Sequence, residues 1–134
     1  MKIEKVLRYD WNYAEYIVTD GINNVICMCI SVPLPYNKIP QIGMEVAMLY
    51  AFAFDDIKIV KILKEEDKFF LIKKGKSYFN YKMRGRIIDK EKSIVKIYDL
   101  LISLEYQFEN GFPSNYYNDD FIDFDVDRLD CYIK

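Results

Sequence analysis

The stretch MEVAMLYAFAF, from Met44 to Phe54, alternates large apolar side chains with small ones. Successive side chains of a strand point to opposite faces, so this pattern predicts one long strand. We expect its large face to lie in the core and its small face to let another layer approach closely. The large side chains are Met44, Val46, Met48, Tyr50, Phe52 and Phe54.

Similar alternation continues on both sides of this stretch, and the composition agrees with it. The 134-residue chain is 16% aromatic, with 12 Tyr and 9 Phe, which are residue types that favour strands. In segment 25–32, the side chains expected to face the core are Ile26, Met28, Ile30 and Val32. The other predicted strands are 2–11, 14–19, 78–88, 93–97, 100–104 and 121–128.

Residues 57–63 fit two kinds of element. A helix with Asp55 or Asp56 as its N-cap would place three apolar side chains on one face. We favour a strand because most of these residues are β-branched, and β-branched side chains lose freedom in a helix.

Short strands separated by turn residues predict an all-β fold, either a small antiparallel barrel or a sandwich. Over residues 2–64, the succession of five strands resembles an OB-type barrel without its usual helix. The pattern also resembles small bacterial β-proteins of unassigned activity. We treat 1–134 as one domain. Its parts 1–66 and 69–134 echo each other, either as degenerate repeats or as unrelated β segments of similar pattern.

Charge is distributed unevenly along the chain, which has a net charge of −2 and a pI of about 5.2. Residues 1–57 hold 4 basic and 7 acidic side chains, and residues 58–96 hold 13 and 5. Residues 97–134 hold 2 basic and 9 acidic side chains. An explanation of the fold should therefore account for a basic middle and an acidic end.

Two charged rows with the period of a strand explain much of this imbalance. The basic row lies in 78–88 and the acidic row lies in 121–128. Opposite charges across neighbouring strands favour pairing and help to select its register. We therefore predict that these strands are neighbours, with both rows on one solvent-exposed face. The rows are Lys82, Arg84 and Arg86, and Asp123, Asp125 and Asp127.

Few residues here could support catalysis or bind a metal. The chain has no His, so the Ser–His and Cys–His nucleophile arrangements are absent, and it has no glycine-rich phosphate-binding motif. The three cysteines, Cys27, Cys29 and Cys131, are too few for a usual structural zinc site, and we expect buried thiols. We predict no enzyme, metal or cofactor; a carboxylate-based hydrolase is the third-ranked alternative.

The preferred function is a non-catalytic binding module for another protein. Without a signal peptide or a membrane-spanning run in the sequence, we expect a soluble cytoplasmic protein. The candidate protein-binding residues are the loop aromatics Trp11, Tyr13, Tyr36, Phe112, Tyr116 and Tyr117. The alternative is single-stranded nucleic-acid binding, which the acidic pI disfavours. Its candidate residues are Tyr78, Tyr81, Lys82, Arg84 and Arg86.

Overall fold

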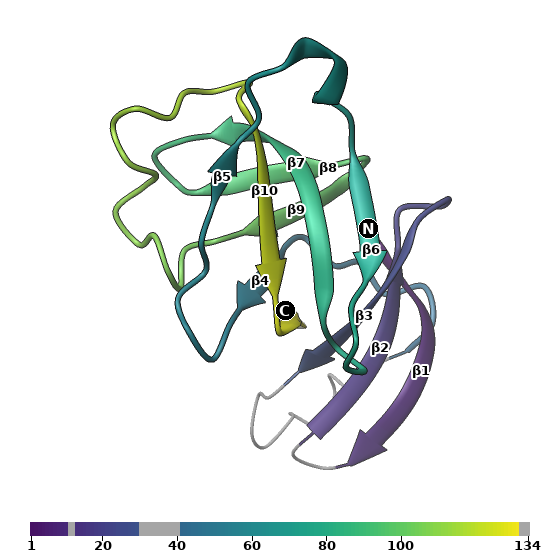
Figure 1. Ribbon diagram of the computed structural model, residues 1–134. Helices are drawn as coiled ribbons and strands as arrows, with labels where there is room; N and C mark the ends of the chain where they lie inside the picture. The colour runs from purple at the N-terminus through teal and green to yellow at the C-terminus, as the bar shows by residue number, and fades with distance from the viewer. Residues whose placement is uncertain (11–12, 30–40, 132–134) are drawn as a thin grey trace.

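The computed structural model describes residues 1–10, 13–29 and 41–131, and it confirms the all-β class (Figure 1). Within these ranges there is no α-helix, and a short 3-10 turn lies at Glu65–Asp67. The strands are β1 (Lys2–Asp10), β2 (Tyr13–Thr19), β3 (Asn24–Cys29), β4 (Leu49–Phe52), β5 (Val60–Lys61), β6 (Leu71–Lys74), β7 (Tyr81–Asp89), β8 (Ile94–Ile97), β9 (Leu100–Ser103), β10 (Phe121–Val126) and β11 (Arg128–Cys131).

These strands form one sheet, in the order β1-β2-β3-β11-β4-β9-β8-β7-β10-β5, and β6 pairs with β7 beside this path. β10 and β11 follow each other in the chain on either side of Asp127. The N–H of Asp127 donates to the carbonyl of Phe52 (2.8 Å), so the chain moves from one set of neighbours to another at this residue. The hydrogen-bonded path does not close, and the predicted barrel is therefore not confirmed.

The core lies against one face of β7 and β10, as their alternation predicts. Gly85 shows how tightly this face is packed. A Cβ atom there would lie 2.5 Å from Cγ1 of Ile97 and 2.8 Å from the carbonyl of Lys96, so a larger residue would displace the neighbouring strand. The other inward residues of these two strands are Tyr81, Met83, Ile87, Ile122, Phe124 and Val126, and all of them are buried.

The predicted core face of β3 is wrong. Ile26 and Met28 are only half-buried, whereas Val25, Cys27 and Cys29 are fully buried. Both faces of this strand are apolar, so the alternation could not show which one the sheet would cover. The remaining two residues expected on the core face, Ile30 and Val32, lie outside the described residues.

The prediction for Met44–Phe54 holds at the start of the stretch and is wrong further on. Val46, from the large face, is buried, and its neighbours Glu45 and Ala47 are exposed. The regular strand in this stretch is short, β4, and its buried residues are Leu49 and Ala51, from the small face. The large side chains of Tyr50 and Phe52 are half-buried, and Phe54 is 80% exposed. β4 lies between β11 and β9 in the sheet.

The choice of a strand for residues 57–63 is confirmed, although the element is much shorter than predicted. Only Val60–Lys61 pair as β5, against Asp123 and Ile122 of β10. The N–H of Ile62 continues the pairing by donating to the carbonyl of Phe121 (2.8 Å).

The predicted pairing of the two charged rows is also confirmed. β7 and β10 are antiparallel neighbours, with Arg84 directly opposite Asp123 and Lys82 directly opposite Asp125. Arg86 faces Phe121 instead of a carboxylate, because the acidic row and the basic row are offset along their strands.

Candidate functional site

The segment between β9 and β10 carries three of the aromatic residues predicted to contact a partner. It turns sharply at Gly111, whose φ of +96° favours glycine. A Cβ atom at Gly111 would also lie 3.0 Å from the carbonyl of Lys90. The N–H of Phe112 donates to that same carbonyl (3.0 Å), so the segment is held against the turn between β7 and β8.

Phe112 lies in the core, where 5% of its surface is exposed. Its ring centroid lies 5.3 Å from that of Phe108 and 6.5 Å from that of Tyr116. Tyr116 is half-buried, and its hydroxyl donates to the carbonyl of Ile59 (3.4 Å). These two aromatics therefore close one end of the core and anchor the residue that follows them.

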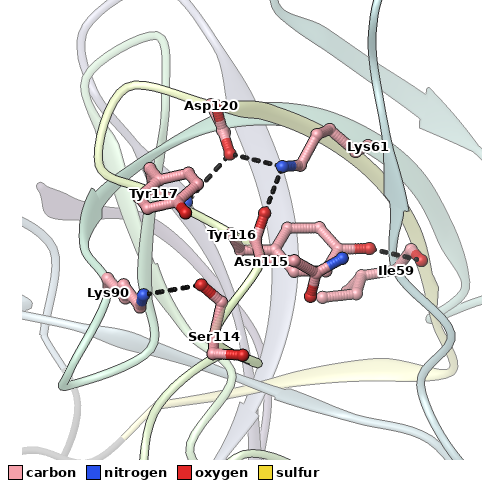
Figure 2. A network of polar contacts seen from close by, with 8 residues as sticks. All are labelled: Ile59, Lys61, Lys90, Ser114, Asn115, Tyr116, Tyr117 and Asp120. Atoms are coloured by element: carbon pink, nitrogen blue, oxygen red, sulfur yellow. Dashed lines mark hydrogen bonds and ion pairs between the residues drawn. The ribbon is translucent and has the colours of Figure 1, made fainter.

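Tyr117 differs from both, because 61% of it is exposed although the residue is held in place (Figure 2). Its ring centroid lies 4.9 Å from Nζ of Lys90 and 5.5 Å from Nζ of Lys61. Two cations near one ring favour a single ring position through cation–π attraction. The backbone N–H of Tyr117 also donates to Oδ2 of Asp120 (2.8 Å).

The same two lysines bind the backbone of the loop. Nζ of Lys61 forms an ion pair with Asp120 (3.1 Å) and donates to the carbonyl of Asn115, while Nζ of Lys90 donates to the carbonyl of Ser114 (3.3 Å) (Figure 2). We call the residues that hold the ring, Lys61, Lys90, Asp120 and Tyr117, the tyrosine clamp. Its charged side chains are engaged within the protein, so the ring of Tyr117 is its main exposed feature.

Sequence reasoning found Tyr117 but missed the three charged members of the tyrosine clamp. Lys61 lies on β5, Lys90 lies in the turn after β7, and Asp120 directly precedes β10. No spacing in the sequence relates them, because only the strand order brings these segments together.

The remaining interaction candidates do not join this site. Tyr13 is half-buried on β2, its hydroxyl donates to Glu15, and Cζ of Arg8 lies 5.4 Å from its ring centroid. Burial, together with the bond to Glu15, raises the pKa of Tyr13 to about 12. Trp11 and Tyr36 lie outside the described residues.

Arg84, a nucleic-acid candidate, is fully engaged by its neighbours. Its Nε and Nη2 donate to the two carboxylate oxygens of Asp123 (2.6 and 3.0 Å), and Nη1 donates to the carbonyl of Asp67 (2.9 Å). The ring centroid of Phe69 lies 4.6 Å from its Cζ. Hydrogen bonding to Asp123 raises the pKa of Arg84 above its ordinary value. Little of this guanidinium is left to meet a phosphate.

Among the other nucleic-acid candidates, burial separates those that could meet a ligand from those that could not. Tyr81 is buried and its hydroxyl accepts the N–H of Ile26 (2.8 Å), so its ring cannot stack on a base. Nη1 of Arg86 lies 3.7 Å from Oδ1 of Asp119, so its charge already faces a carboxylate of the protein. Tyr78 is 52% exposed and Lys82 is exposed, so the structure leaves these two accessible.

The three cysteines are free and buried, as predicted. Sγ of Cys27 lies 3.2 Å from Sγ of Cys131, across the neighbouring strands β3 and β11. The hydrogen bond between the two thiols, burial and the other nearby thiol raise the pKa of Cys131, and burial raises the pKa of Tyr16 beside them. Protonated thiols in this setting are poor nucleophiles.

Residues 1–10, 13–29 and 41–131 contain no group of three or more His, Cys, Asp or Glu arranged to hold a metal ion. In the same part of the chain, no helix is long and apolar enough to cross a membrane.

Comparison of the chain with protein-family models, curated proteins and solved structures found no match.

Proposed function

We propose that this chain is a non-catalytic module that binds another protein through the surface around Tyr117. The observation that carries the proposal is that 61% of Tyr117 is exposed although two cations and an N–H···carboxylate bond hold it in place. Tyrosine is enriched among the residues that dominate binding energy at protein interfaces.

An aromatic side chain that is fixed before binding loses less conformational freedom when a partner covers it. The hydrogen bonds to the carbonyls of Asn115 and Ser114 extend this order to the backbone before Tyr117. A nearly rigid loop on a sheet is the kind of support that binding surfaces need. These features support recognition of a partner with a pocket for one aromatic ring.

The test compares the wild-type protein with Tyr117→Ala in affinity capture from lysate of the native host. Tyr9→Ala is the matched control, since Tyr9 is 42% exposed on β1, away from the tyrosine clamp. We expect a partner that the wild type and Tyr9→Ala retain and that Tyr117→Ala loses, and we expect the same ranking with the purified partner. Equal binding by all three would contradict the proposal.

A cytoplasmic location and an OB-like barrel belong to the same proposal. The three free, buried thiols fit a reducing compartment. In support of the barrel, β10 and β11 are consecutive parts of the chain that pair with β7 and β4, at the two ends of the path β4-β9-β8-β7.

A further inference from the structure

β6 pairs with β7 in a hairpin on the other side of β10 from β5, the strand that supplies Lys61 to the tyrosine clamp (Figure 1). From Phe69 to Ile88 the chain contains six basic residues and no acidic residue. Within this stretch Lys73 of β6 lies directly opposite Lys82 of β7. Like charges directly across a pair of strands oppose pairing, so the fold tolerates an unfavourable contact here.

The lysines of this hairpin face solvent on a rigid support. Gly75 and Asn80 close its tip, where the N–H of Gly75 donates to the carbonyl of Asn80 (2.7 Å). Nδ2 of Asn80 donates to the carbonyl of Val126 (3.1 Å), which fastens the tip to the end of β10. The exposed pair on one face of the hairpin, Lys73 and Lys82, is what we call the lysine patch. Lys74 lies on the opposite face, where its Nζ donates to the carbonyls of Ser77 and Asn80.

β6 also offers an open backbone edge, because it pairs only with β7 among the described strands. Hydrogen-bonded pairs alternate along antiparallel strands, and Gly75 with Asn80 is one such pair. The next hydrogen-bonded pairs, counted along the hairpin away from its tip, are therefore Lys73 with Lys82 and Leu71 with Arg84. The backbone groups of Ile72 and Lys74 consequently point away from β7.

The two ends of the main path are less open. At β1, the N–H of Gly43 donates to the carbonyl of Ile3 (2.7 Å), and the N–H of Ile3 donates to the carbonyl of Met44 (2.9 Å). β5 has only two residues, so it offers a very short edge. Among the described strands, β6 thus combines an open edge with a concentrated charge.

We propose that an extended acidic segment of a partner protein binds along β6 as an added strand. Its main chain would bond the outward groups of Ile72 and Lys74. Side chains at every second position would share the face of Lys73 and Lys82, so carboxylates spaced in this way would meet the lysine patch. The inference rests on the proposed protein-binding function and assigns it a second surface with a defined partner chemistry.

The surroundings of β6 suit such a segment. A groove of about 530 Å³ lies beside Phe70, the residue before β6. Ile22 and Tyr98 contribute apolar surface to it, and Asp20, Asp99 and Lys96 also line it. It could receive an apolar side chain of the segment. The same lysines disfavour pairing with a second copy of β6, since identical basic strands repel each other.

An acidic protein segment fits better than a nucleic-acid strand. Asp125 of β10 lies directly opposite Lys82, and Asp123 of β10 binds the guanidinium of Arg84. Carboxylates therefore border the lysine patch. A short segment needs only the lysines, whereas a phosphate chain that continued past them would meet these carboxylates. The chain as a whole is also acidic, with a pI of about 5.2.

The test measures fluorescence anisotropy at low salt with the full-length chain and a labelled hexapeptide that alternates Glu and Thr. A hexapeptide of the same composition with its Glu residues in one block is the sequence control, and labelled oligothymidylate is the nucleic-acid arm. We expect the alternating peptide to bind most tightly, and Lys73→Glu and Lys82→Glu each to weaken it about tenfold. No binding of the alternating peptide, or tighter binding of oligothymidylate, would overturn the inference.

A second pair of variants isolates the backbone edge. Lys74→Pro and Lys74→Ala remove the same charge, but only proline also removes the outward N–H. We expect Lys74→Pro to bind the alternating peptide several-fold more weakly than Lys74→Ala, with thermal unfolding showing that both are folded. Equal affinity would overturn strand addition. Tyr117→Ala should bind the peptide normally, so failure at β6 is distinguishable from failure of the tyrosine clamp.

Discussion

Two neighbouring positions of β7 carry the same charge but have different surroundings. Arg84 faces Asp123 on β10 and Leu71 on β6, whereas Lys82 faces Asp125 on β10 and Lys73 on β6. The guanidinium of Arg84 is enclosed by a carboxylate, a backbone carbonyl and the ring of Phe69. Lys82 is exposed and forms no ion pair within the described part of the chain.

The difference teaches that a charged row read from sequence can serve two purposes. At Arg84 the charge is used inside the fold. Its bidentate contact with Asp123, in which the two side chains are 15% and 22% exposed, stabilises the pairing of β7 with β10. At Lys82 the charge faces solvent beside a like charge, so it contributes little to folding and is available to a partner. The predictions below test this division.

The largest effect should come from Arg84→Ala. The substitution leaves Asp123 partly buried without its partner, and we expect the free energy of unfolding to fall by about 2–3 kcal/mol. Urea denaturation of the variant and the wild type measures this change. Lys82→Ala is the matched control and should change the free energy of unfolding by less than about 0.5 kcal/mol. Similar losses for both variants would break the comparison.

Double-mutant cycles test the comparison between Arg84 and Lys82 more directly. We expect a coupling free energy of about 1–2 kcal/mol between Arg84 and Asp123, since both side chains hold one fixed geometry. The coupling between Lys82 and Asp125 should be about 0.3 kcal/mol or less, because water screens exposed pairs. The same urea experiments on the single and double alanine variants provide both values.

Asn80→Ala should destabilise the protein by about 1 kcal/mol, the usual cost of losing a partly buried neutral hydrogen bond. It removes the contact with Val126 that fastens the hairpin tip. Hydrogen exchange should speed up in β6 more than in β8, which pairs with the end of β7 that lies away from the tip. Unchanged exchange in β6 would show that the hairpin is rigid without this contact.

Lys73→Glu should raise the free energy of unfolding by about 0.5 kcal/mol at low salt, because it converts a like-charge contact into an opposite-charge one. The gain should shrink as salt screens the pair. Thermal unfolding at two salt concentrations measures it. A loss of stability would mean that Lys73 already has a favourable role in the fold.

The last effect appears only at alkaline pH. The pKa of Tyr13 is raised to about 12, above the value of about 10 for an unfolded tyrosine. Its contribution to stability is therefore fully present below pH 10 and is lost as the pH rises toward 12. An ultraviolet titration should show one late-ionising tyrosine that disappears in Tyr13→Phe. Glu15→Gln should lower that pKa, since the carboxylate of Glu15 accepts a hydrogen bond from the hydroxyl and its negative charge opposes ionisation of the tyrosine.

Strand type, turn positions and the pairing of β7 with β10 could be predicted from the sequence, because each depends on a local pattern of period two. The inward residues Met83 and Ile122 alternate with outward charges, so only one face of these strands could be buried. β3 and β4 carry apolar residues on both faces. Their orientation was mispredicted because nothing local distinguishes Cys27 from Met28 as a core residue.

The tyrosine clamp was likewise only partly predictable from the sequence. Tyr117 could be predicted as an exposed loop aromatic from its neighbours in the chain, but Phe112 in the same loop proved to be core. The sequence by itself determined an all-β chain, its uneven charge and its lack of histidine. Only the tertiary structure decided that Lys61 and Lys90 meet at one ring, and that β6 keeps an open edge. Those outcomes depend on strand order, which arises from contacts between residues far apart in the chain.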